Sequence, residues 1–164
     1  MDKKKIGVII ILLGLVLTFI WGHSLAPKAV SAEESTSVAS FLQTLLDTLH
    51  IPITLTNHTV RKLAHFTEHA AAGVLLGLLF FPFARSALKR PRKALLYAAP
   101  FALGFLIGLT DETIQLFSGR GAMFRDVLID LAGASFGALL SLLILYLKGK
   151  RRTDGNEDQQ KKDI

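Results

Sequence analysis

Residues 65–69 read H-F-T-E-H, which is the inverted zinc-protease signature H-x-x-E-H. On a helix, His65 and His69 lie one turn apart on the same face, a geometry that suits two imidazole ligands on a zinc ion. Glu68 would then act as the general base of a hydrolytic reaction. A third ligand would be needed, and Asp111 or Glu112 could supply it from a later segment.

The rest of the chain gives this zinc site little support. Patterns of five residues arise often by chance, and nothing else in the sequence resembles a zinc hydrolase. The absence of cysteine excludes thiolate metal sites as well as disulfides. We therefore expect no metal and no cofactor, and keep a zinc site made by His65, His69 and Glu112 as the alternative.

Other polar side chains have types that could bind an anion or exchange protons. Arginine binds phosphate and carboxylate groups through paired hydrogen bonds, and buried acids beside a histidine can act as acid–base pairs. Such residues occur in three segments, 61–69, 111–120 and 126–130. The candidate polar cluster consists of Arg61, Lys62, His65, Glu68, Asp111, Glu112, Gln115, Arg120, Asp126 and Asp130.

These segments border long apolar blocks, which must position them. Hydrophobic residues make up 51% of the chain and the mean hydropathy is +0.44, which is high for a soluble domain of this size. About 20 apolar helical residues cross the hydrocarbon core of a bilayer. We predict an all-α, polytopic membrane bundle of four transmembrane helices, with spans at 6–21, 63–83, 94–110 and 126–147.

The distribution of Lys and Arg predicts the orientation of these spans in the cell membrane. Fourteen of these residues fall on one side of the predicted spans and five on the other. Because cytoplasmic loops carry the excess of positive charge, both termini should be cytoplasmic. The first span could also be a cleaved signal, since V-S-A precedes Glu33, but we expect a retained anchor.

Two further segments lie outside the predicted spans. Residues 34–50 place apolar side chains at helical spacing, so we expect an extracellular amphipathic helix that is capped by residues 35–37 and ended by Pro52. Residues 151–164 are polar, so we expect a disordered cytoplasmic tail after a membrane domain of residues 1–150. The basic residues flank apolar blocks, which argues against binding to nucleic acid.

Helical spacing predicts that the polar residues of the later spans point into the bundle. Asp111 follows Gly104 and Gly108 on one face, and Asp130 precedes Gly133 and Gly137 on another. Gly-x-x-x-Gly faces allow close helix packing, either within one chain or between chains, so the oligomeric state stays open. All the acids should therefore meet at one depth near the outer surface. His23, His50 and His58 are assigned to the outer loop, without a role.

Two motifs resemble the VanZ-like family. One is K-L-A-H-F-T-E, residues 62–68, and the other is D-E-T-I-Q-L-F-S-G-R-G-A-M-F-R-D-V-L-I-D-L-A-G-A-S-F-G, residues 111–137. The similarity covers about residues 10–147. The chain departs from the family at His69, where relatives usually have an aromatic residue, and at Ser118, where proline is frequent. The founding member of the family is associated with teicoplanin resistance.

We weigh two main functions for the predicted outer cluster. The first is binding of an amphiphile, such as a lipid headgroup, a lipid-linked wall precursor or a lipoglycopeptide, with a contribution to glycopeptide resistance of the teicoplanin type. The alternative is a membrane-embedded enzyme that acts on a lipid or wall precursor by acid–base chemistry or, less favoured, with zinc. Membrane lipids are partners in either case. Proton passage is disfavoured because the inner halves of the spans are apolar.

Overall fold

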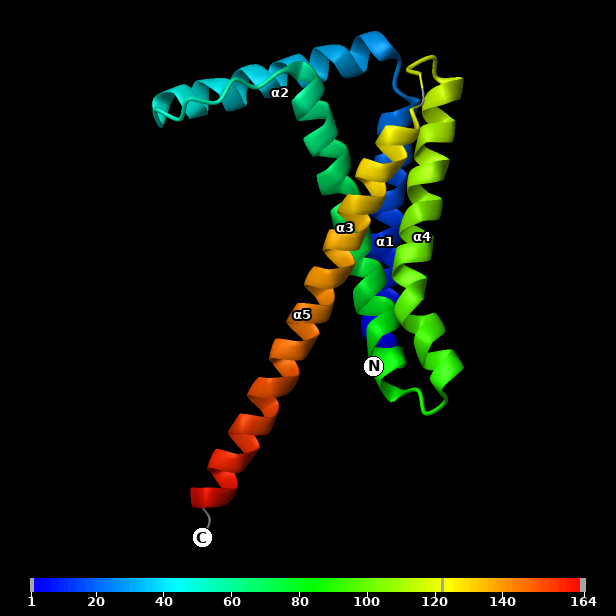
Figure 1. Ribbon diagram of the computed structural model, residues 1–164, viewed down its shortest axis with the longest axis vertical. Coiled ribbons are helices and arrows are strands. Elements are labelled where there is room, and N and C mark those ends of the chain that lie inside the picture. The colour runs from blue at the N-terminus through cyan, green and yellow to red at the C-terminus, as the bar shows by residue number, and fades with distance from the viewer. Residues whose placement is uncertain (1, 122, 163–164) are drawn as a thin grey trace.

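The computed structural model describes residues 2–121 and 123–162, and these form five helices without a strand (Figure 1). The helices are α1 (Lys3–Leu25), α2 (Lys28–Thr48), α3 (Asn57–Ser86), α4 (Arg90–Phe117) and α5 (Phe124–Lys162). Four of them, all except α2, are long and apolar enough to cross a membrane. The predicted all-α bundle with four transmembrane helices is confirmed.

Each transmembrane helix is longer than the span predicted for it. The apolar run of α3 is preceded by a polar turn that begins at Asn57. Thr56 caps this turn, because its side chain accepts a hydrogen bond from the backbone N–H of Thr59. The predicted spans followed hydropathy, whereas the helices continue through their polar ends to a capping residue. The extension of α4 to Phe117 places residues 111–112, which lie just beyond the predicted span, inside the helix.

Glycine brings α3 and α5 into backbone contact. A Cβ atom at Gly137 would lie 1.9 Å from the carbonyl oxygen of Ala70, and one at Gly133 would lie 2.3 Å from that of Phe66. No side chain larger than hydrogen fits such a crossing without displacing the helices. The fourth helix also uses small residues, since a Cβ at Gly108 would lie 2.8 Å from Cβ of Asp130. The glycine faces therefore pack within one chain.

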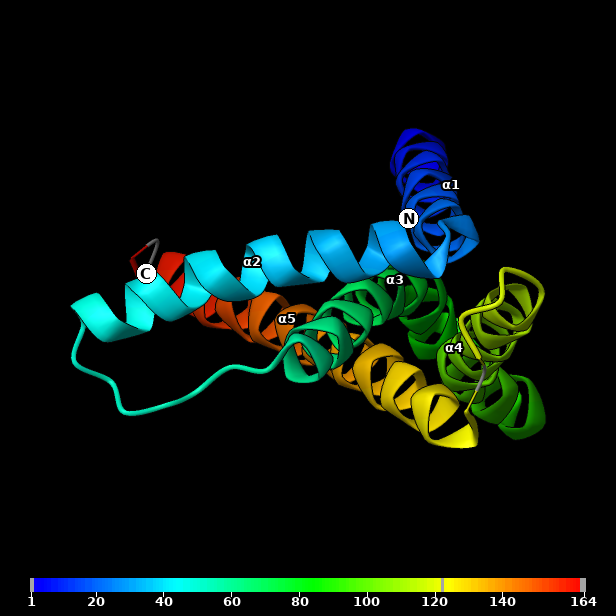
Figure 2. The same cartoon turned by 90° about the horizontal axis from the view of Figure 1, so that it is seen from above.

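The second helix lies crosswise over one end of the bundle, and its distal end extends beyond it (Figures 1 and 2). It begins at Lys28, directly after Pro27, so the expected start near residue 35 is wrong. The hydroxyl of Ser35 bonds to the carbonyl oxygen of Ser31 inside the helix at 2.6 Å and does not cap it. At the other end, His50 adopts a positive φ of 54°, which closes the helix before Pro52.

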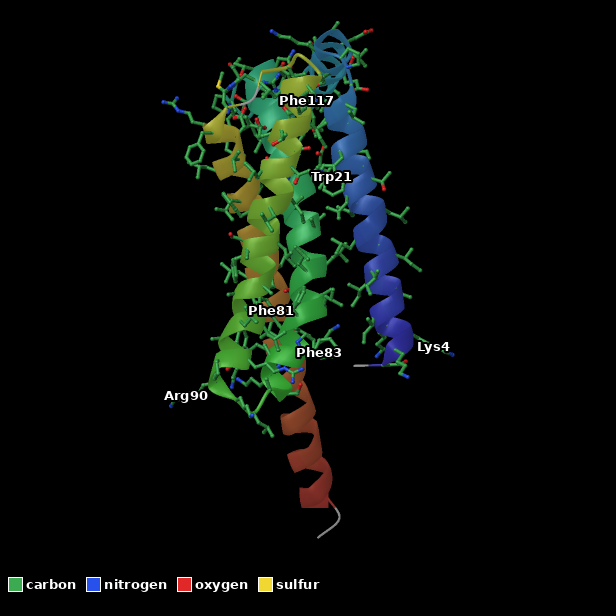
Figure 3. The ribbon with its side chains drawn as sticks, turned by 90° about the vertical axis from the view of Figure 1, so that its right-hand side faces the viewer. Lys4, Trp21, Phe81, Phe83, Arg90 and Phe117 are labelled. Atoms are coloured by element: carbon green, nitrogen blue, oxygen red, sulfur yellow. The ribbon has the colours of Figure 1, made fainter. Side chains whose placement is uncertain are left out.

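The two ends of the bundle differ in charge. Lys4 and Arg90 lie at one end and Phe117 lies at the other, beside α2 (Figure 3). The basic residues that follow α3 share the end of Lys4, as the charge distribution predicts. The fifth helix continues to Lys162, and the predicted disorder of 151–164 remains untested, with residues 163–164 outside the described part of the chain.

Candidate functional site

A fully buried carboxylate, Asp111, joins three helices at the end of the bundle beside α2. The hydroxyl of Ser24 on α1 donates to Asp111 Oδ1 at 2.6 Å, and the amide of Gln115 donates to Oδ2 at 2.9 Å. Nδ1 of His65 on α3 lies 3.4 Å from Oδ2. The carboxylate thus holds α1, α3 and α4 in register, because a buried charge must be satisfied on all sides.

The neighbouring Glu112 is also buried and connects α4 to the turn that follows it. It accepts a hydrogen bond from Gln115 at 3.2 Å and another from the backbone N–H of Met123 at 3.1 Å. Neither it nor Asp111 forms an ion pair with a lysine or arginine among the described residues. Asp111 therefore relies on neutral donors and on His65, and Glu112 relies on neutral donors.

Two buried histidines of α3 face the carboxylate of Asp130 on α5. Oδ1 of Asp130 lies 3.6 Å from Nδ1 of His65 and 3.4 Å from Nδ1 of His69. Neither carboxylate oxygen of Asp130 has a hydrogen-bond partner in the described part of the chain. The carboxylate grouped with both imidazoles is that of Asp130, whereas Glu112, which the alternative zinc site used, is grouped with Asp111 and Asp130.

Beside this buried group, the ammonium of Lys62 pairs with the carboxylate of Asp126 at 2.5 Å. A small pocket lies at this ion pair, and its lining includes Arg61 as well as Lys62 and Asp126. The pocket has a volume of about 10 Å³, which is room for about one water molecule. The predicted cations at residues 61–62 are therefore close to the acids, but they do not enclose a space that would hold a headgroup.

The turn between α4 and α5 positions Arg120. Gly119 adopts φ 73° after the end of α4, and the backbone N–H of Arg120 bonds back to the carbonyl oxygen of Gln115 at 3.1 Å. Arg120 is 7% exposed, and its Nη1 donates to the carbonyl oxygen of His23 at 2.9 Å. Its Nε and Nη2 are buried with no partner among the described residues. The edge of the guanidinium that binds anions in pairs is thus unused.

Burial, and next the charge of Arg61, lower the pKa of the Arg120 guanidinium from its ordinary value. Nearby carboxylates, including that of Glu68, act in the opposite direction. The lowered pKa means that the surroundings of Arg120 disfavour its positive charge. A bound anion would offset part of this cost.

The sequence did not reveal the role of His23. It is not in a loop but in the last turn of α1, where its Nε2 lies 3.2 Å from Glu34 of α2 and its Nδ1 lies 3.4 Å from Glu68 of α3. Glu68 therefore faces α1 rather than the acids of α4 and α5. The signal that could have identified His23 is its position directly after the apolar run that ends at Trp21.

A groove between α2 and α3 leads to Glu68. It has a volume of about 360 Å³, and its walls are mainly apolar. The lining residues are Val38, Leu42, Val60, Leu63, Ala64, Thr67 and Glu68. The groove thus has apolar walls and a carboxylate at one end. That carboxylate contacts the His23 side chain, and the carbonyl oxygen of His23 accepts the hydrogen bond from Arg120.

Most of the chain, residues 9–145, matches the pattern of the VanZ/LLP1 family. The chain belongs to this family. No curated protein and no solved structure matches it. The family match covers both motifs from which the resemblance was inferred, and these motifs now have positions. The first lies on α3, and the second spans the end of α4, the turn with Arg120 and the start of α5. The two motifs of this VanZ/LLP1 member therefore meet at the end of the bundle beside α2.

Proposed function

We propose that the protein lies in the bacterial cell membrane and binds an amphiphile that has an anionic headgroup at the end of the bundle beside α2. The unused, buried edge of the Arg120 guanidinium is the observation on which this proposal rests. A phosphate or a carboxylate can accept two parallel hydrogen bonds from that edge. The family link to teicoplanin resistance is consistent with a lipid headgroup, a lipid-linked wall precursor or a lipoglycopeptide as the ligand.

The groove between α2 and α3 would receive the apolar part of the ligand. Its apolar walls suit a lipid tail, and Glu68 at its end suits a hydroxyl or an ammonium of the headgroup. The apolar side chains on the exposed side of α2, such as Phe41 and Leu45, would rest on the bilayer surface. With α2 on the bilayer surface and the ligand in the groove, the protein would sequester or shield an amphiphile at the outer leaflet.

Replacing Arg120 with glutamine should weaken binding of an anionic amphiphile about 10- to 100-fold, because the variant loses hydrogen bonds to a charged group. Filling the groove with Ala64→Phe should also weaken binding. The measurement is native mass spectrometry of the purified protein with three probes: phosphatidylglycerol, a polyprenyl diphosphate and teicoplanin. The probe whose binding depends on both positions identifies the ligand class.

Two matched variants serve as controls. Arg92→Gln removes an exposed arginine from the opposite end of α4. Ala71→Phe adds the same ring to α3 at an exposed position that lies two turns after Ala64 and does not line the groove. Both should bind the probes like the unmodified protein. In a susceptible bacterium, production of the protein should raise teicoplanin resistance, and Arg120→Gln should remove the gain. Equal binding by Arg120→Gln and Arg92→Gln would contradict the proposed headgroup site.

We further propose that both termini are cytoplasmic and that α2 lies outside the cell. The chain has no cysteine, so single cysteines can report on topology without further changes. Thr48→Cys, at the end of α2, should react with a membrane-impermeant maleimide in intact cells. Ser86→Cys, at the end of α3, should react only after the cells are permeabilised. The reverse pattern would contradict the orientation inferred from Lys and Arg.

A membrane-embedded enzyme is the second candidate. The ligand atoms of Asp111, Glu112 and Asp130 lie within 4.8 Å of one another and are buried, and His65 contacts two of these acids. Grouped acids with a histidine can transfer protons to and from a substrate. This candidate is less favoured, because the pocket beside the acids holds only about 10 Å³. Conversion of one of the lipid probes to a new species by the purified protein would favour it.

A further inference from the structure

A buried group of three side chains, His65, His69 and Asp130, has features of a metal site. The ligand atoms of His65, His69 and Asp130 lie within 4.8 Å of one another. His65 Nδ1 lies 3.4 Å from Asp111 Oδ2 and 3.6 Å from Asp130 Oδ1. In a tetrahedral zinc site with bonds near 2.0–2.1 Å, neighbouring ligand atoms are about 3.3 Å apart. The spacing between His65 and Asp130 is thus close to that of two ligands around one ion.

Hydrogen bonding does not account for these contacts. His65 Nδ1, both oxygens of Asp130 and His69 Nε2 are buried, and none of them has a hydrogen-bond partner in the described part of the chain. His69 and Asp130 are completely shielded from solvent. Unsatisfied buried polar atoms are rare in folded proteins and point to a missing ion, water or ligand. Four of them on three neighbouring side chains therefore require an explanation.

The hydrogen bond of His69 leaves one of its nitrogens ready for a metal. Its Nδ1 lies 2.9 Å from the carbonyl oxygen of His65, and because a carbonyl only accepts, Nδ1 carries the proton. The lone pair is then on Nε2, which is the atom without a partner. Histidines that bind metals commonly donate their other ring N–H to a backbone carbonyl in this way. In this tautomer a metal would be bound through Nε2, while the protonated Nδ1 lies 3.4 Å from Asp130 Oδ1.

Charge leads to the same conclusion. Asp111, Glu112 and Asp130 group together, and no lysine or arginine among the described residues forms an ion pair with them. Lys62 is paired with Asp126 instead. Buried carboxylates need compensating charge, and a divalent cation supplies two units in one position. Imidazole and carboxylate together suit zinc and similar transition metals better than magnesium or calcium, which prefer oxygen ligands alone.

We propose that His65, His69 and Asp130 bind one divalent transition metal of the zinc class between α3 and α5. This inference goes beyond the amphiphile site, because it concerns a different group of side chains. It also replaces the sequence-based expectation of no metal. The competing interpretation is a protonated His65 that is ion-paired with the two aspartates.

The test uses the full chain, purified with an affinity tag that contains no histidine and then stripped of metal with a chelator. Addition of Zn²⁺ should load one ion per chain, measured by elemental analysis after gel filtration. Co²⁺ should give the visible absorption of an imidazole–carboxylate site. His69→Gln and Asp130→Asn should each weaken Zn²⁺ binding at least 10-fold, whereas His23→Gln, a histidine that also contacts two carboxylates, should leave it unchanged.

A second measurement covers the case in which the variants do not fold. Zn²⁺ should raise the unfolding temperature of the unmodified protein, and a chelator should reverse the rise. No Zn²⁺ loading and no thermal shift in the unmodified protein would overturn the proposal in favour of the protonated His65. Equal loading by the unmodified protein, His69→Gln and Asp130→Asn would overturn it as well. If Mg²⁺ binds the site as tightly as Zn²⁺ and displaces it, the assignment to the zinc class would be wrong.

Discussion

Gly137→Ala is expected to destabilise the protein by about 3 kcal/mol or to prevent folding, because the new methyl group meets a backbone rather than a side chain. The added Cβ would lie 1.9 Å from the carbonyl oxygen of Ala70 and 2.8 Å from the backbone nitrogen of Val74. Neither atom can rotate away, so α3 and α5 must separate. Separation also draws Asp130 away from the two histidines of α3. Denaturation in mixed detergent micelles measures the loss.

The matched control is Gly14→Ala on α1, where nothing lies within 4 Å of the new Cβ. This variant adds the same methyl group to a helix and should be neutral or slightly stabilising, because alanine favours helix more than glycine does. If both variants unfold at the same detergent concentration, α3 and α5 do not cross at Gly137. The size of the difference measures how closely this crossing is packed.

Asp111→Ala is expected to have the second large effect, with a loss of about 3–5 kcal/mol in the free energy of unfolding. The substitution leaves the Ser24 hydroxyl and the Gln115 amide without their common acceptor, and both are buried. It also removes a contact of His65. Because these partners come from α1, α4 and α3, the loss should loosen the attachment of α1 to the rest of the bundle.

Two comparisons separate this effect from a general loss of charge. Asp47→Ala removes an exposed aspartate from α2 and should cost less than about 0.5 kcal/mol, as surface substitutions usually do. Asp111→Asn keeps one acceptor oxygen for Ser24 but turns an amide N–H₂ toward a neighbouring donor, so its cost should fall between the other two. Stability of Asp111→Ala equal to that of Asp47→Ala would show that the carboxylate does not connect the helices. Proteolysis in micelles can report separately on α1.

Hydropathy and charge were sufficient to predict the architecture. An apolar run of about 20 residues can satisfy its backbone groups in lipid only as a helix, and the basic residues gather at one end of such helices. The glycine spacing likewise indicated which faces of α4 and α5 point inward, because Gly108 and Gly137 make close contacts in the structure. These features depend on local sequence, so no knowledge of the partners was needed.

The convergence of His65, Asp111, Glu112 and Asp130 was also predictable in outline. Each of them lies near the same end of a span, so helices of similar length bring them to one level. Depth along a helix follows from counting residues at 1.5 Å per residue. The sequence therefore placed these four residues at one level but did not give their contacts.

The pairing of individual side chains depended on how the helices rotate and cross. Glu68 and His65 are three residues apart on α3, yet Glu68 contacts His23 of α1 while His65 contacts Asp111 and Asp130. Helical spacing cannot distinguish these outcomes, because a face about 100° wide can border two neighbouring helices. The partner of Lys62 and the carbonyl oxygen that binds Arg120 likewise belong to other helices, which packing brings near. Those atoms are far away in the sequence, and packing alone places them.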